Sequence, residues 1–251
     1  MKQNILITGA AGGLGKEVAI QMAAKGYNLA LIDMNQAALA QLQTELSQRH
    51  SGINIEIAVL NITDFAAVKT VFSDLAQRLG GLDIVWANAG VEGGSDIGDE
   101  DNFAAIEKVI AVNLVGTIAC IEKSVALFKQ QGYGHMAVTS SLSAVRGMAG
   151  DGYGGYSASK SGVNRYMESL YAELMRDGLH KKITTSTIMP GHIATAMVKD
   201  TDKGVITVGA AATAIVDALE SRKRNVIIKG AFWTAIRWLL PILPTKWVLD
   251  F

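Results

Sequence analysis

A glycine-rich turn directly after the first apolar run of the chain is the feature that most restricts its fold. The apolar residues 5–7 end at Thr8, four glycines follow within residues 9–15, and residues 16–25 then have helical spacing up to Gly26. Glycines between a strand and a helix permit a tight turn and a close approach of the backbone to a pyrophosphate. This context therefore predicts a dinucleotide site at the N-terminus of a helix. The alternative is a glycine turn that serves packing alone.

Apolar runs typical of strands alternate with segments of helical spacing along the rest of the chain. We expect strands at residues 5–7, 29–32, 53–60, 82–87, 135–139, 183–188 and 226–228, and helices at residues 16–25, 36–48, 64–79, 103–128, 156–177 and 208–220. Such alternation favours a parallel sheet covered on both faces. The predicted fold is α/β: a Rossmann-type doubly wound parallel sheet in a single three-layer α/β/α domain, with residues 1–230 as the dinucleotide-binding catalytic domain.

Composition and charge limit the classes of function. Hydrophobic residues make up 49% of the chain and the formal net charge is zero, so a sizeable core is available and no basic excess indicates nucleic-acid binding. Cys120 is the only cysteine, which excludes an intrachain disulfide and fits a reducing compartment. We find no signal-peptide pattern and no run with the length and apolarity of a transmembrane helix. We expect a cytoplasmic protein.

Two loops stand out between these elements. Residues 92–101 are acidic and are interpreted as a solvated surface loop. Residues 147–155 contain five glycines in nine positions, and because glycine adds backbone freedom we expect that loop to be mobile.

Asp33 ends the second predicted strand, where it bears on the choice of cofactor. A carboxylate at this position can accept hydrogen bonds from the adenosine ribose and repels a 2′-phosphate. The residues just after Asp33 include no Arg or Lys, so the sequence favours NAD over NADP. The alternative is that Asp33 only caps the helix that starts after Asn35.

The segment from Tyr156 to Lys160 is where we expect the chemistry. On a helix the phenol and the ammonium lie four residues apart on one face. An ammonium held near a phenol favours the phenolate and lowers the tyrosine pKa, so the tyrosine can exchange a proton with a substrate oxygen. The alternative is a partly buried helix with a surface lysine, and one such pair is a weak signal by itself.

Six motifs in order make the chain resemble the short-chain dehydrogenase/reductase (SDR) family from about residue 4 to about residue 228. Each motif of the family follows a particular strand or lies on a particular helix, and the order along this chain is the same. The matching residues are the turn Thr8 to Gly15, Asn88-Ala89-Gly90, Asn113, the serines after the fifth strand, Tyr156 with Lys160, and Pro190-Gly191 with Thr195 following.

The resemblance implies a catalytic tetrad of Asn113, a serine, Tyr156 and Lys160. The serine would hold the substrate oxygen and the tyrosine would exchange its proton. The lysine would lower the tyrosine pKa and bind the nicotinamide ribose, and the asparagine would hold a water that links the lysine to solvent. Among Ser140, Ser141 and Ser143 we favour Ser141, because the family's strand ending of a hydrophobic run and two serines matches there. Ser143, thirteen residues before the tyrosine, is the alternative.

The resemblance also implies which residues contact the cofactor, and no metal site is predicted. One departure concerns adenine: Asn61 stands where the family usually has an aspartate. Its carbonyl oxygen can still accept from the adenine amino group, or the residue only opens a helix. The implied cofactor-binding residues are Thr8, Gly9, Gly12, Gly13, Leu14, Gly15, Asp33, Asn61, Ile62, Asn88, Ala89, Gly90, Tyr156, Lys160, Pro190, Gly191, Ile193 and Thr195.

The expected activity is NAD(P)-dependent interconversion of a secondary alcohol and a ketone, with Tyr156 as the general acid/base and NAD(H) favoured. One rival is an epimerase or dehydratase of the same family. Another is a catalytically silent dinucleotide-binding sensor or scaffold. An intact set of Asn113, Ser141, Tyr156 and Lys160 argues against the scaffold.

Residues 231–251 form an apolar, aromatic C-terminal extension with three of the four tryptophans. We expect this tail to pack on a partner subunit or over the site; the alternative is an interfacial membrane segment. Two prolines interrupt it, and it is too short to span a membrane. The expected partners are a small apolar alcohol or ketone and further copies of the chain, in a homodimer or homotetramer built on the two long helices.

Overall fold

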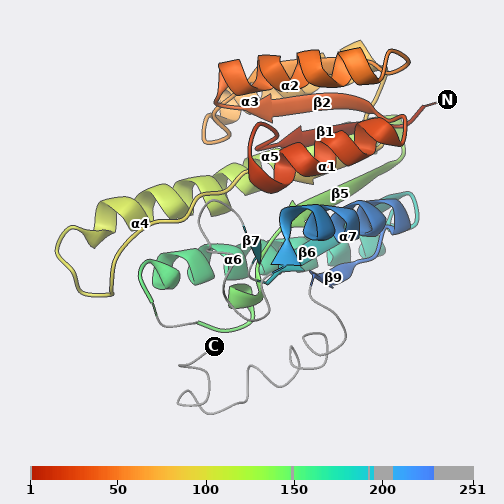
Figure 1. Cartoon of the computed structure of the whole chain (residues 1–251). Coiled ribbons are helices and arrows are strands. Elements are labelled where there is room, and N and C mark those ends of the chain that lie inside the picture. Colours follow the sequence, from red (N-terminus) through yellow and green to blue (C-terminus); the bar gives the residue numbers. More distant parts are fainter. Residues whose placement is uncertain (1, 148–149, 192, 195–205, 229–251) are drawn as a thin grey trace.

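Seven strands form the central sheet in the computed structural model, which describes residues 2–147, 150–191, 193–194 and 206–228 (Figure 1). Their order is β3-β2-β1-β4-β5-β6-β9, and each neighbouring pair is parallel. The order reverses between β1 and β4, and doubly wound sheets bind ligands at the carboxyl ends of the strands at such a point. The strands are β1 (Asn4–Thr8), β2 (Asn28–Asp33), β3 (Ile55–Val59), β4 (Ile84–Ala87), β5 (Gly134–Thr139), β6 (Ile183–Pro190) and β9 (Asn225–Ile228).

Helices cover both faces of the sheet and bury two apolar cores. One core contains residues of α1 (Gly13–Ala24), α2 (Gln36–Arg49) and α7 (Val208–Ser221), and the other contains residues of α3 (Phe65–Leu79), α5 (Thr117–Gln131) and α6 (Tyr153–Arg176). Alternate residues of β1 enter opposite cores: Ile5 and Ile7 the first, Leu6 the second. This period of two is what a strand buried on both faces requires. The predicted three-layer α/β/α fold is confirmed.

The predicted elements are present, and several of their bounds differ. β3 is shorter than the predicted strand at residues 53–60, because the chain at residues 51–53 still turns after α2. α6 begins at Tyr153 rather than at Tyr156, and Gly152 precedes it with a left-handed φ of 74°. Residues 153–155 of the predicted glycine loop are therefore the first turn of α6.

The helix predicted at residues 103–128 is a continuous helical stretch with a change of geometry inside it. α4 (Asn102–Ile110) leads into the π-helical segment η1 (Ala111–Gly116), which leads into α5. By length and composition the stretch from Asn102 to Gln131 could cross a membrane, a property that we did not predict from the sequence. Its α5 part packs on α3, β4 and β5, and core helices of this kind are equally apolar.

Two short strands lie beyond β6 and were not predicted. β7 (Ile193–Ala194) and β8 (Ile206–Thr207) pair in parallel, which brings together the two ends of residues 193–207, the segment that we expect from the sequence to form the substrate loop. The chain between them, and the tail at residues 231–251, lie outside the described residues.

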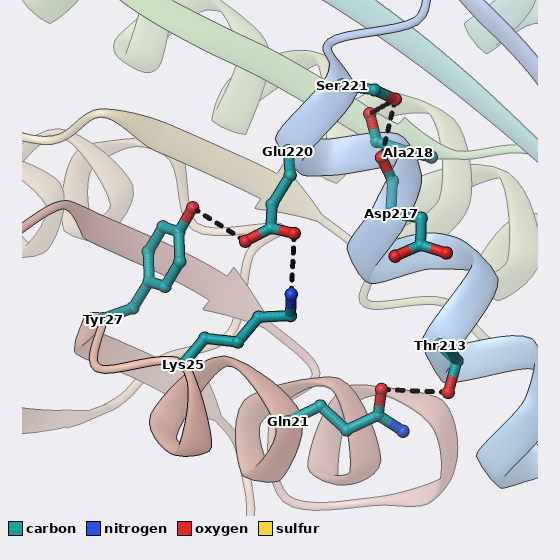
Figure 2. Close-up of polar contacts among 8 residues, drawn as sticks. All are labelled: Gln21, Lys25, Tyr27, Thr213, Asp217, Ala218, Glu220 and Ser221. Atoms are coloured by element: carbon teal, nitrogen blue, oxygen red, sulfur yellow. Dashed lines mark hydrogen bonds and ion pairs between the residues drawn. The ribbon is translucent and has the colours of Figure 1, made fainter.

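Polar contacts fix α7 against α1, as Figure 2 shows. Lys25 Nζ lies 2.9 Å from Glu220 Oε2, Tyr27 donates to Glu220 Oε1 at 3.4 Å, and Thr213 donates to Gln21 at 3.2 Å. α1 starts at the glycine turn and α7 starts directly after β8. The contacts lie in and beyond the C-terminal half of α1 and along α7, so they fix the packing of these two helices against each other.

Candidate active site

Hydrogen bonds join the ends of β1, β4 and β5 at the point where the strand order reverses. Thr8 Oγ1 accepts from the backbone N–H groups of Asn88 and Ala89 at 3.0 Å each. Asn88 Nδ2 donates to the Thr8 carbonyl at 3.2 Å, and Thr139 Oγ1 donates to Asn88 Oδ1 at 3.1 Å. Thr8, Asn88 and Ala89 therefore join the ends of β1 and β4 at the carboxyl edge of the sheet.

The glycines of the turn separate into two groups by what surrounds them. A Cβ on Gly15 would lie 2.0 Å from the Gly9 carbonyl oxygen, and one on Gly9 would lie 2.9 Å from Ala89 Cα, so these two glycines serve packing. A Cβ on Gly12 or Gly13 would instead point into open space, with no neighbouring atom within 4 Å. Gly12 has an extended φ of −135°, which any residue adopts. Neither packing nor conformation explains Gly12, whereas a ligand approaching the backbone does.

The N-terminus of α1 opens onto this free space. Gly12 is the N-cap and no side chain caps the helix. The first N–H groups of a helix have no partner within the helix, so those of Gly13 and Leu14 are suited to hold a pyrophosphate. The turn fits the predicted dinucleotide.

Asp33 ends β2, and each of its carboxylate oxygens accepts one backbone N–H. Ala11 donates to Oδ2 at 3.0 Å and Asn35 donates to Oδ1 at 3.0 Å. Asn35 itself caps α2, because its side chain accepts from Ala38. Asp33 is therefore not the cap of that helix, and its remaining lone pairs are available to ribose hydroxyls.

The residues expected around adenine are more constrained than the sequence suggests. Asn61 Oδ1 accepts from the backbone and the hydroxyl of Thr63 at 3.1 and 2.9 Å. This oxygen, which we expected to accept from adenine, is thus already engaged. Ile62 is buried, and a Cβ on Gly116 would lie 2.8 Å from its side chain. The close approach of η1 to Ile62 is a tertiary contact that no local pattern reveals.

Asn113 lies in the π-helical segment, where it fastens the loop that follows β4. Its Oδ1 accepts from the Val91 N–H and its Nδ2 donates to the Val91 carbonyl, both at 2.8 Å. π-helical turns within longer helices are frequent at functional sites. The side chain we expected to hold a water is therefore used to position residues 90–92 beside Lys160: a Cβ on Gly90 would lie 3.5 Å from Lys160 Nζ.

Lys160 is buried in α6 beneath the end of β5. Its Nζ donates to the Thr139 carbonyl at 2.9 Å, and among the described residues no other acceptor is recorded for it. An ammonium has three donors, so two remain for other ligands, which fits a ribose. Burial lowers the pKa of Lys160 to about 8. Thr139 was not predicted as part of the site, although its place at the end of β5 could have indicated it.

Tyr156 occupies the first turn of α6, with Lys160 Nζ 5.7 Å from its ring centroid. Burial first, and the charge of Glu92 second, raise the pKa of Tyr156 to about 12, while a hydrogen bond with the Ser141 hydroxyl acts to lower it. The expected lowering by Lys160 is absent from the protein alone. The reason is the order of titration: a lysine with a pKa of about 8 is already neutral at a pH where this tyrosine ionises.

The two candidate serines are arranged one behind the other. Ser141 is hydrogen bonded to the Tyr156 phenol. Ser143 is buried and donates to Ser141 Oγ at 2.9 Å. The structure thus places Ser141 against the tyrosine and Ser143 behind Ser141.

The remaining predicted residues lie beyond β6. Pro190 ends that strand, and the Gly191 N–H donates to the Ile228 carbonyl at 3.4 Å. Ile193 is buried in the core under α7, so its side chain is structural in the described part. Thr195 lies outside the described residues.

The chain belongs to the short-chain dehydrogenase family, because the model of that family matches residues 3–205. An uncharacterised oxidoreductase of Mycobacterium tuberculosis H37Rv is 34% identical over 98% of this chain and 95% of its own. The 2-dehydro-3-deoxy-L-rhamnonate dehydrogenase (NAD(+)) of a Sphingomonas strain is 35% identical over 69% of this chain and 67% of its own. The crystal structure of levodione reductase superposes with a TM-score of 0.81, 26% identity, and coverage of 93% of this chain and 98% of that one.

The protein is therefore an oxidoreductase of the short-chain type, and its cofactor class is a nicotinamide dinucleotide. Solved structures of this fold include a complex with NAD at 22% identity and an NADPH-dependent reductase at 26% identity. The turn at Gly12, the free donors of Lys160 and the carboxylate of Asp33 all fit such a cofactor.

Proposed function

We propose that the protein interconverts a secondary alcohol and a ketone, with Tyr156 as the general acid/base. The observation that carries this proposal is the contact series at the ends of β5 and α6. Ser141 is hydrogen bonded to Tyr156, and the Lys160 ammonium lies 5.7 Å from the tyrosine ring beside the carboxyl edge of the sheet. A silent scaffold has no use for this arrangement of donors.

The roles of the side chains follow from their positions. The Ser141 hydroxyl holds the substrate oxygen and orients it toward the phenol. Tyr156 donates its proton to that oxygen during reduction and recovers a proton during oxidation. Lys160 lies beneath the tyrosine with two free donors, so it holds the nicotinamide ribose and favours the phenolate. The bound dinucleotide supplies or accepts the hydride.

We further propose that the tyrosine is tuned only in the loaded enzyme. A pKa of about 12 makes the phenol a poor base at neutral pH. Ribose hydroxyls accepting from the Lys160 Nζ favour the ammonium and raise the lysine pKa from about 8. The charged lysine then lowers the tyrosine pKa. Cofactor binding would thus precede productive proton transfer.

NAD(H) is the favoured cofactor in this proposal. Asp33 presents both carboxylate oxygens at the end of β2, where a 2′-phosphate would meet a negative charge. The related Sphingomonas dehydrogenase carries NAD(+) in its name, which supports the same choice.

A panel of alcohols and ketones tests the activity. We expect NADH fluorescence to rise with at least one secondary alcohol and to fall with the matching ketone. The panel should span apolar, cyclic, sugar-acid and amino ketones, because the names of the relatives point to more than one substrate class. Cofactor binding without turnover on the whole panel would contradict the proposal and would favour a sensor or scaffold.

We also propose a cytoplasmic homodimer or homotetramer. Phe103 of α4 and Val115 of η1 are 74% and 56% exposed, and apolar side chains of this size on a long helix are suited to a subunit interface. Light scattering measures the assembly. A tail that covers the site or contacts a membrane stays a separate hypothesis, tested by removing residues 231–251.

A further inference from the structure

The loop after β4 is fastened at two points beside the proposed catalytic residues. At one end, Asn113 holds both polar backbone atoms of Val91 at 2.8 Å. At the other end, the Gly152 N–H donates to the Ser95 carbonyl at 3.1 Å. A Cβ on Gly152 would lie 2.4 Å from the Gly93 carbonyl oxygen, so the loop lies directly on the N-terminal end of α6. Figure 1 shows this loop, which precedes α4, beside the start of α6.

Glu92 lies between these two points. Its side chain is exposed, and among the described residues it has no hydrogen-bond or ion-pair partner. Its negative charge nevertheless acts on Tyr153, Tyr156 and Lys160, because it raises the pKa of each. Gly90, two residues earlier, lies so close to α6 that a Cβ there would be 3.5 Å from Lys160 Nζ, which places residue 92 near the side of α6 where the proposed reaction occurs.

The other acidic residues of the loop do not share this property. Asp96, Asp99, Glu100 and Asp101 are exposed, and none of them is among the charges that act on Tyr156 or Lys160. The acidic character of residues 92–101 is therefore not uniform. Glu92 directly follows Val91, the residue that Asn113 fastens, and the other acidic residues lie four or more positions further along the loop.

We propose that Glu92 selects the substrate by charge. The site accepts a ketone or secondary alcohol that carries an ammonium group in preference to its neutral isostere, and it disfavours one that carries a carboxylate. The inference rests on the proposed function and adds the class of its substrate. An unpaired carboxylate beside a binding site attracts a cation and repels an anion.

Binding of three matched probes tests this proposal without requiring turnover. The probes are 4-acetylphenyl-trimethylammonium, 4-tert-butylacetophenone and 4-acetylbenzoate, of which the first two are nearly isosteric. Calorimetric titration into NADH-saturated protein should give about fivefold tighter binding of the cation than of the neutral ketone, a ratio typical of one partly exposed charge pair. The carboxylate should bind about fivefold more weakly than the neutral ketone.

Variants of the loop identify the residue responsible. Glu92→Gln should remove the preference, Glu92→Asp should retain part of it, and Glu92→Lys should reverse the order of cation and anion. Glu100→Gln, on the same loop, is the matched control and should leave the ratios unchanged. A merely structural role of Glu92 would weaken all three probes alike.

The two proposals fail in different ways. Equal binding of the three probes, absence of binding by the cation, or an unchanged ratio in Glu92→Gln overturns the charge-selection proposal. Failure of the proposed function is instead the absence of turnover on the whole panel of alcohols and ketones, whatever the probes do.

Discussion

On the β1 and β4 side of the site, closely packed glycines and the hydrogen bonds of Thr8 and Asn88 set the shape, whereas on the β5 and α6 side buried ionisable side chains set the charge. The turn after β1 depends on Gly9 and Gly15, which let two backbone segments approach closely. The other side depends on the buried Lys160 bonded to Thr139, and on Tyr156 bonded to Ser141. Backbone contact fixes shape, and buried ionisable side chains fix charge. Substitutions on the two sides should therefore fail differently.

The largest effect on activity is expected on the β5 and α6 side of the site. Tyr156→Phe should lower kcat at least about a thousandfold, because it removes the proton-transfer group, while the Kd for NADH stays within about twofold of the wild type. Stopped-flow turnover and fluorescence titration of NADH measure the two quantities. Wild-type kcat in the variant would refute the assignment of Tyr156.

Substitutions of the closely packed glycines in the turn after β1 should lower the stability of the folded protein. Gly15→Ala places a carbon 2.0 Å from the Gly9 oxygen, and such overpacking should lower the free energy of unfolding by about 3 kcal/mol or more. Gly12→Ala, where the space is open, is the matched control and should change stability by less than about 0.5 kcal/mol. Its Kd for NADH should nevertheless rise about tenfold. Denaturant unfolding and NADH titration together separate packing glycines from ligand glycines.

The pH dependence of stability should reveal the lowered pKa of the buried Lys160, on the β5 and α6 side of the site. The pKa of Lys160 is about 8 in the folded protein against 10.5 for an ordinary lysine. Between these values the unfolded chain binds a proton that the folded protein does not, so the free energy of unfolding should rise with pH, by at most about 3 kcal/mol. Lys160→Met should remove this rise. Urea unfolding from pH 7 to 9.5 should show about 2 kcal/mol of this rise as a difference between the two proteins, because the raised pKa values of Cys120 and Tyr156 lower the stability of both proteins alike as the pH increases. If the free energy of unfolding changed with pH in the same way in both proteins, the lowered pKa of Lys160 would be contradicted.

Ser141 and Ser143 offer a finer test of the β5 and α6 side of the site. Ser141→Ala should lower kcat/KM about a hundredfold, as expected when a donor to the reacting oxygen is lost. Ser143→Ala should cost less than about tenfold, because Ser143 only supports Ser141. Thermal melting must show equal folding of the two variants. A greater loss of kcat/KM in Ser143→Ala than in Ser141→Ala would show that Ser143 is the catalytic serine.

The smallest effect concerns the choice of cofactor. Asp33→Ala should reduce the preference for NAD over NADP about tenfold, because it removes the charge that repels the 2′-phosphate. The ratio of kcat/KM for the two cofactors is the measurement, and Asn35→Ala, which removes only the helix cap, is the control. A wild-type preference for NADP would show that another group binds the phosphate.

Most of the fold was predictable because its signals are local. The buried strands appear in the sequence as apolar runs. Asn35 and Asp64 cap helices at the positions where the sequence predicts that helices begin. The start of α6 was misplaced by three residues, since glycines at 152, 154 and 155 suggested a loop although the N-terminal turn of a helix tolerates them when it is packed. The π-helical turn around Asn113 has no local signal, and in the structure it carries the side chain that bonds Val91, 22 residues away along the chain.

The sequence by itself determined the helices and strands, their alternation and the residue types of the site. These depend on hydrophobic periodicity, glycine turns and the order of motifs, which are local properties of the chain. Only the tertiary structure decided the electrostatics. Thr139, Glu92 and Lys160 are far apart in sequence, yet burial of the lysine beneath β5 and the position of Glu92 set the pKa values of Tyr156 and Lys160. A pKa depends on the solvent and the charges around a group, and those are properties of the packed molecule.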